Sequence, residues 1–257
     1  MRRVATPSQA LTRPAAEVIR ATPVQQASNG VLYAASGETA ISAAELEKMV
    51  AAVPRAIAAA LVDARKAYYF VPLAVSDGES DKSETLIADR YDVALSDRAI
   101  CHRNLTLGDS QCVFISTRLM DDKFSVAFEF YINVGHAFVE RAGVSGEFAD
   151  LAWAQVERKV RGETSLDAHE FRKQATSSAN DPANEKAKND YFGAAFADSI
   201  AIYMLSLYLD VDYYELRERE YPLLAPAAMA ERLKKVHELF PPNPGFEFNI
   251  FYRRRTI

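Results

Sequence analysis

Helical periodicity of hydrophobic and polar residues covers most of the chain from residue 41 onward. The stretch 41–68 has a helical composition, and Ser42 followed by Glu45 has the spacing of a capping box. Pro54 falls inside this stretch, and proline breaks the interior of a helix, so two helices are predicted there. Further helices are predicted over 124–142, 146–160, 190–209, 211–220 and 227–239.

Two shorter apolar runs have the composition of β-strands. Residues 68–75 (YYFVPLAV) and 112–116 (CVFIS) are rich in aromatic and β-branched residues and are bounded by turn residues. Polar loops are predicted over 76–84 and 177–189, and 246–255 is predicted to be a closing strand or a docked tail. A short mixed sheet followed by a helical region indicates an α+β fold.

The composition is that of a soluble globular protein. The chain has 257 residues, of which 49% are hydrophobic and 25% are charged, and this length allows one large domain or two small ones. Its formal net charge of −5 argues against a broad basic surface, so no nucleic-acid partner is expected. The most apolar helix carries Asp198 near its centre, so no membrane span is expected. Cys101 and Cys112 are too few for a disulfide-built fold, and although they flank a predicted turn that would allow a bridge, two free thiols are expected.

Residues 1–36 differ in composition from the rest of the chain. They are rich in Ala, Thr, Ser, Pro, Gln and Arg, and Glu17 is their single acidic residue. This composition predicts a disordered leader over 1–36 and one folded domain over 37–257. No apolar segment follows the N-terminal arginines, so no secretory signal peptide is expected. A cytoplasmic location, or secretion as an effector or toxin without such a signal, agrees with this leader.

The predicted helix 124–142 carries the first candidate for chemistry. One narrow arc of its helical wheel holds four polar residues, namely Glu129, Asn133, His136 and Glu140. An imidazole and a carboxylate at positions i and i+4 can bind one metal ion from the same side. The same stripe is also typical of the solvent-facing side of an amphipathic helix, so this pair alone leaves both interpretations open.

The predicted helix 190–209 carries two isolated carboxylates. Asp198 is the only charge between Tyr191 and Leu209, and Asp190 stands directly before this run. A carboxylate on a nearly apolar helix has to be paired, protonated or bound to an ion. Asp190 also fits the ordinary role of an acid at a helix N-terminus, and small residues on its face allow another helix to approach closely.

In this order the two helices resemble a known family. HAFVE at 136–140, followed by NDYFGAAFADSIAIY at 189–203, resembles the gluzincin branch of zinc metallopeptidases, in particular the family of the anthrax lethal factor catalytic domain. The resemblance covers about residues 45–240. It implies a zincin-like domain, with a short mixed sheet packed on a helical bundle, in which 112–116 is the edge strand along the substrate cleft.

The resemblance also implies a set of metal ligands, with several of the family's residues replaced. His136 matches the first histidine ligand, Glu140 stands in place of the second histidine, and Asp190 stands in place of the glutamate ligand. Asp198 matches a further, accessory acid. Ala137 occupies the position of the glutamate that takes a proton from the metal-bound water, and alanine cannot perform this step.

Three functions agree with these residues. The first is a divergent metallopeptidase-family protein, a pseudoenzyme that binds a protein or peptide in the former substrate cleft. The second is an active metal-dependent peptidase, a hydrolase in which Ala137 is an engineered change and the metal is Zn, or Mn or Fe because carboxylates favour harder ions. The third is a non-enzymatic interaction domain that binds no metal and resembles the family by accident.

Overall fold

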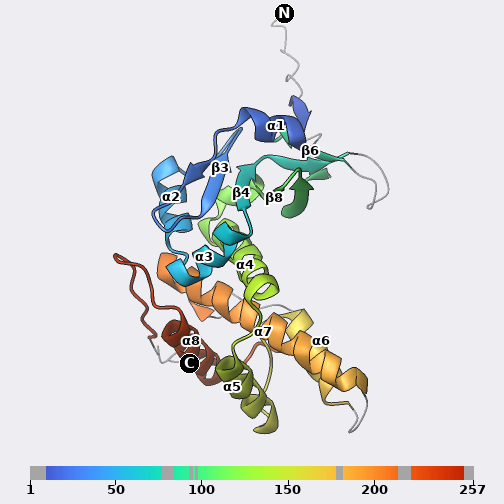
Figure 1. Cartoon of the computed structure of the whole chain (residues 1–257), viewed down its shortest axis with the longest axis vertical. Helices are drawn as coiled ribbons and strands as arrows, with labels where there is room; N and C mark the ends of the chain where they lie inside the picture. The colour runs from blue at the N-terminus through green and yellow to red at the C-terminus, as the bar shows by residue number, and fades with distance from the viewer. Residues whose placement is uncertain are drawn as a thin grey trace, which may run out of the picture. The chain divides into compact units, whose positions relative to one another are not determined.

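The computed structural model describes residues 10–76, 84–92, 95, 98–177, 182–213 and 221–251, and these form helices and two β-sheets (Figure 1). The predicted α+β class is confirmed. The predicted single domain over 37–257 differs from the structure, which divides into two compact units. Unit 1 comprises Met1–Val50 and Val62–Glu129, and unit 2 comprises Ala51–Leu61 and Phe130–Ile257. Helix α4 (Lys123–Ala142) contributes residues to both.

Unit 1 contains a five-stranded sheet. Its strands, in spatial order, are β2 (Gln25–Gln26), β3 (Leu32–Ala35), β4 (Lys66–Val71), β8 (Ser110–Ser116) and β7 (His102–Leu107). The three central strands are parallel, and β2 and β7 are antiparallel edge strands. The predicted strand 112–116 lies within β8, which pairs with β4 on one side and β7 on the other. The expectation that 112–116 is an edge strand is therefore wrong, because β7 covers it.

A second sheet in unit 1 consists of β1 (Thr12–Pro14), β6 (Thr85–Ala88) and β5 (Leu73–Val75), all antiparallel. The run predicted as one strand over 68–75 forms two strands, β4 and β5, in different sheets. Pro72 separates them, since proline has no N–H to donate to a ladder. Its carbonyl accepts a hydrogen bond from Ala88 N at 2.9 Å and so starts the second sheet.

One helix and three short strands lie between residues 12 and 35, which corrects the prediction of a disordered leader over 1–36. Helix α1 (Ala15–Ala21) buries Val18 in a core cluster that also contains Tyr69 of β4 and Phe114 of β8. Strand β3 continues this segment and pairs in parallel with β4. The few apolar residues here are stabilised by strands distant in the sequence, which composition cannot indicate. Residues 1–9 lie outside the described residues.

The predicted capping box and helix break are both confirmed. Helix α2 (Ala43–Ala51) begins after Ser42, whose hydroxyl accepts a hydrogen bond from Glu45 N at 3.2 Å. The Glu45 carboxylate in turn accepts from Ser42 N at 3.2 Å. Helix α3 (Arg55–Asp63) begins directly after Pro54.

The long central helix of unit 2 is α7 (Pro182–Tyr208). It packs against α5 (Gly146–Glu157), α6 (Leu166–Ala175) and α8 (Pro226–Leu239). Part of α7, Asn184–Tyr208, is long and apolar enough to cross a membrane by composition, but 78% of its most apolar window is buried inside the protein. This burial is typical of the core helix of a soluble protein.

Several predicted boundaries shift in the structure. The predicted loop 177–189 is shorter, because α7 already begins at Pro182. Residues 210–212 are not helical, and the rest of the helix predicted over 211–220 lies, from residue 214, outside the described residues. Most of the loop predicted over 76–84 lies outside them as well. Cys101 and Cys112 are both free, as expected.

Candidate functional site

In unit 2, helix α7 and the part of α4 from Phe130 onward carry the predicted site residues and approach each other closely. A Cβ atom added to Gly135 would lie 2.5 Å from the carbonyl oxygen of Ala197. One turn further along α4, Val139 Cγ1 lies 3.9 Å from the place that a Cβ atom on Gly193 would take. The two contacts advance in opposite directions along the two helices, so the helices are antiparallel at this point. Only a glycine allows the backbones to meet at position 135.

Asp198 lies next to this contact and is almost fully buried, with 4% of its surface exposed. Thr164 Oγ1 donates a hydrogen bond to its carboxylate at 2.7 Å, and the Ser165 side chain bonds to it as well. Burial raises the pKa of Asp198, while these hydrogen bonds and the charge of His136 act in the opposite direction. The carboxylate on the apolar helix thus has partners, and they are mainly hydroxyl groups.

The predicted metal ligands occupy different environments. His136 and Glu140 are exposed on α4, whereas Asp190 is half-buried on α7. Among the residues that the structure describes, no group of three or more His, Cys, Asp or Glu side chains is arranged to hold a metal ion. The metal site at His136, Glu140 and Asp190, with Asp198 as an accessory acid, therefore stays a prediction from the sequence.

The helical wheel of α4 agrees with the structure at most positions. Phe130, Val134 and Ala137 face the interior, as expected. Asn133 differs, because it was expected on the polar arc and is buried. Ala137, at the place of the general base in the resemblance, thus contributes to packing in this fold.

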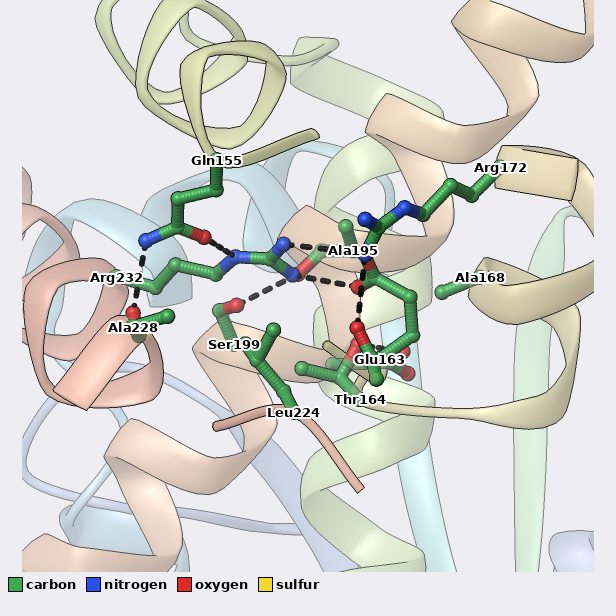
Figure 2. A network of polar contacts seen from close by, with 12 residues as sticks. Gln155, Glu163, Thr164, Ala168, Arg172, Ala195, Ser199, Leu224, Ala228 and Arg232 are labelled. Atoms are coloured by element: carbon green, nitrogen blue, oxygen red, sulfur yellow. Dashed lines mark hydrogen bonds and ion pairs between the residues drawn. The ribbon is translucent and has the colours of Figure 1, made fainter. Parts of the chain in front are cut away.

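A buried cluster of polar side chains in unit 2 was missed by the sequence analysis (Figure 2). Glu163 and Arg232 are both fully buried, and Arg232 Nη1 donates to Glu163 Oε2 at 2.9 Å. Arg232 Nε donates to Gln155 Oε1 at 2.8 Å. Figure 2 shows Glu163 between Arg232 and Arg172, whose Nη1 donates to Glu163 Oε1 at 2.9 Å. One carboxylate therefore accepts hydrogen bonds from two guanidinium groups.

Tyr191 of α7 completes this cluster. Its hydroxyl donates to Glu163 Oε1 at 3.0 Å and accepts from Arg232 Nη2 at 2.9 Å. Burial raises the pKa of Tyr191, so the phenol keeps its proton. Arg172 also donates to the carbonyl oxygens of Val160 and Gly162, at 2.6 Å and 2.9 Å. With these polar groups satisfied, the cluster is a structural connection between helices.

The segment that carries Glu163 is positioned by a short pairing with residues 222–225. Glu163 N donates to Pro222 O at 3.0 Å, and Leu224 N donates to Glu163 O at 2.9 Å. Gly162 has a φ of +84°, and a Cβ atom there would lie 2.1 Å from Leu223 O, so glycine is required. This pairing also sets the place of Thr164 beside Asp198.

One signal in the sequence could have indicated the cluster. Arg232 lies within the apolar stripe of α8, with Ala228 one turn before it and Val236 one turn after it, and all three are buried. An arginine in an apolar stripe predicts a buried acidic partner, because an unpaired buried charge is too costly. The sequence does not show which acid that is.

The outer edge of β7 in unit 1 has hydrogen-bonding groups that no strand among the described residues pairs with. Ser116 N donates to Cys101 O at 2.8 Å, which marks these residues as a hydrogen-bonded pair of the β7–β8 ladder. Such pairs alternate in an antiparallel ladder, so His102, Asn104 and Thr106 direct their N–H and C=O groups outward. The side chains of these three residues are exposed as well.

An ion pair lies at the first residue of this edge. His102 Nδ1 lies 2.5 Å from Glu129 Oε1, and the two side chains are 45% and 21% exposed. The hydrogen bond with Glu129 raises the pKa of His102, although partial burial opposes this. A larger fraction of His102 is therefore protonated at neutral pH than of a free histidine.

No protein-family model matches the sequence, and no curated protein matches it either. The relation to the gluzincins therefore rests on the motifs at 136–140 and 189–203 and remains a prediction.

Proposed function

We propose that this protein binds an extended peptide segment of a partner protein along the outer edge of β7, without peptidase activity. The peptide would add one strand to the five-stranded sheet through main-chain hydrogen bonds. The observation that carries this proposal is the outward direction of the backbone groups of His102, Asn104 and Thr106. Such an edge is a template for strand addition.

The form of β7 supports strand addition. It pairs with β8 over six consecutive residues, from His102 to Leu107, with no proline and no bulge to interrupt it. Proline and bulges are devices that protect edges from pairing with other chains. The exposed residues of β7 are polar and the intervening ones are half-buried. A peptide with alternating polar and apolar residues would therefore match the two faces of the sheet.

A divergent metallopeptidase origin is part of this proposal and rests on the sequence motifs alone. The residues at the family's catalytic positions favour binding over hydrolysis. Ala137 offers no group that could move a proton, and Glu140 stands where the family has an imidazole. A protein of this kind would bind a peptide without hydrolysing it.

The test uses peptides selected from a phage-displayed random library on the full chain. Thr106→Pro removes one outward N–H without breaking a bond to β8, so the fold should tolerate it. We expect Thr106→Pro to weaken the selected peptides about 10-fold or more, and the matched Thr106→Ala to change affinity less than about 3-fold. Hydrogen exchange should slow at the amides of His102, Asn104 and Thr106 when the peptide binds. Equal affinity for both variants would reject the proposal.

Metal analysis separates this proposal from the metal-dependent peptidase. The peptidase alternative is supported by the antiparallel contact of α4 and α7, the helices that carry His136 and Asp190. Near-stoichiometric metal by mass spectrometry, lost in His136→Ala, would favour a metal centre at His136, Glu140 and Asp190. Activity appearing in Ala137→Glu would then establish the peptidase alternative.

A further inference from the structure

The segment that follows α8 runs as an extended chain without helix or strand in unit 2 (Figure 1). Over residues 246–251 (FEFNIF), exposure alternates along the chain. Phe246, Phe248 and Ile250 are half-buried, whereas Glu247 and Asn249 are exposed. The last residue of this segment, Phe251, is 75% exposed. One side of the segment therefore faces the protein and the other faces solvent.

Phe248 packs on a surface that α7 and α8 provide. Its ring centroid lies 5.1 Å from those of both Tyr203 and His237. The Tyr203 hydroxyl donates to Phe240 O at 2.8 Å and lies 3.2 Å from His237 Nδ1. Since a hydroxyl has one proton, His237 Nδ1 is the donor to Tyr203. Tyr203, His237 and Phe240 form what we call the tail-docking surface, and these hydrogen bonds hold it in place.

Residues just before this segment are held much more firmly. Asn243 Nδ2 donates to Ala51 O and Val53 O, at 2.9 Å and 2.8 Å, and its Oδ1 accepts from Arg55 N at 3.0 Å. Gly245 then turns the chain with a φ of +90°. In contrast, residues 247–251 make no backbone hydrogen bond to other described residues, and side chains provide their contacts. Asn243 is thus a fixed point, and residues 246–251 can detach without breaking a ladder among the described residues.

We propose that the tail-docking surface is a second peptide-binding site and that residues 246–251 are its internal ligand. The ligand that replaces them is an extended segment of a partner protein with the pattern aromatic–x–aromatic–x–aliphatic. The bound tail itself shows the complementarity, because its middle aromatic residue packs against both Tyr203 and His237. This site lies in unit 2 and does not depend on the β7 edge.

The tail also limits access to its own surface. A segment joined by a short linker has an effective local concentration in the millimolar range, so a partner segment has to outcompete it. Removal of the tail should therefore expose the site.

The probe is a fluorescein-labelled peptide with the sequence of residues 244–251, measured by fluorescence anisotropy. We expect the chain truncated after Gly245 to bind it about 10-fold or more tightly than the full chain does. A probe carrying Phe248→Ala should lose about 10-fold or more in affinity, and the matched Asn249→Ala probe less than about 3-fold. Equal binding by the truncated and full chains would overturn the proposal, as would no binding by a truncated chain that circular dichroism shows to be folded.

A second variant keeps the test decisive if truncation unfolds the protein. Phe248→Ala in the full chain releases the tail and leaves the surface intact, so this variant should bind the unmodified probe. Adding His237→Ala should weaken that binding, whereas adding Lys234→Ala, on the exposed side of α8, should not. A folded Phe248→Ala protein that does not bind the probe would also overturn the proposal.

Discussion

The cluster around Glu163 in unit 2 and the outer edge of β7 in unit 1 both concentrate hydrogen-bonding groups, and they differ in where those groups point. Glu163 satisfies Arg172, Arg232 and Tyr191 inside the protein. The backbone groups of His102, Asn104 and Thr106 point outward instead. In a fully satisfied buried network every donor and acceptor already has a partner inside the protein, so none is available to bind a ligand. An open edge keeps that capacity, so the β7 edge is the better functional candidate.

The largest effect is expected from breaking the buried cluster. Glu163→Ala leaves two guanidinium groups without their carboxylate, and the free energy of unfolding should fall by about 3–5 kcal/mol. Chemical denaturation measures this change. The matched control is Glu170→Ala, which removes an exposed ion pair with Lys173 at 3.8 Å. Its cost should stay below about 1 kcal/mol. Similar losses in both variants would show that the buried cluster is not the structural connection described above.

An intermediate effect is expected where α4 meets α7. Gly135→Ala forces a Cβ atom against Ala197 O, and the free energy of unfolding should fall by about 1–3 kcal/mol. Gly193→Ala makes the same chemical change on the facing helix, where the added atom meets Val139 at an ordinary 3.9 Å. This control should gain up to about 1 kcal/mol from helix propensity. Thermal unfolding compares the two, and a loss in Gly193→Ala as large as in Gly135→Ala would contradict the close approach.

The smallest effect is expected at the β7 edge. The pKa of His102 is raised in the folded protein by Glu129, so this pair stabilises the fold at pH values below the histidine's unfolded pKa. The contribution is lost as the pH rises through the folded pKa. Both side chains are partly exposed, so Glu129→Gln should cost less than about 1 kcal/mol, and only on the acidic side. NMR titration of His102 should show a lower pKa in the variant, and an unchanged pKa would refute the contact.

Local rules predicted much of the fold. The capping box at Ser42 and Glu45, the break at Pro54 and the inward face of α4 depend on residues close together in the sequence. Helix α1 was missed, because strands more than 40 residues away bury Val18. The edge position of β7 was missed for the same reason, since strand order is set by long-range pairing.

The site was predicted less well than the fold. The sequence indicated that Asp198 needs a partner, and the structure supplies Thr164 and Ser165. It could not indicate that Glu163 pairs with Arg232, because 69 residues separate the two. A charge within an apolar stripe shows that a partner exists, while the identity of that partner depends on how the helices assemble.

The buried acid of α7 has a consequence during synthesis, before the helices around it have folded. A nascent segment as long and apolar as Asn184–Tyr208 resembles the segments that the translocation machinery inserts into membranes. An aspartate at the centre of such a helix adds about 2.5–3.5 kcal/mol to the free energy of insertion. Asp198 therefore biases the newly made chain away from the bilayer, and Thr164 and Ser165 then bind the same carboxylate once unit 2 has formed.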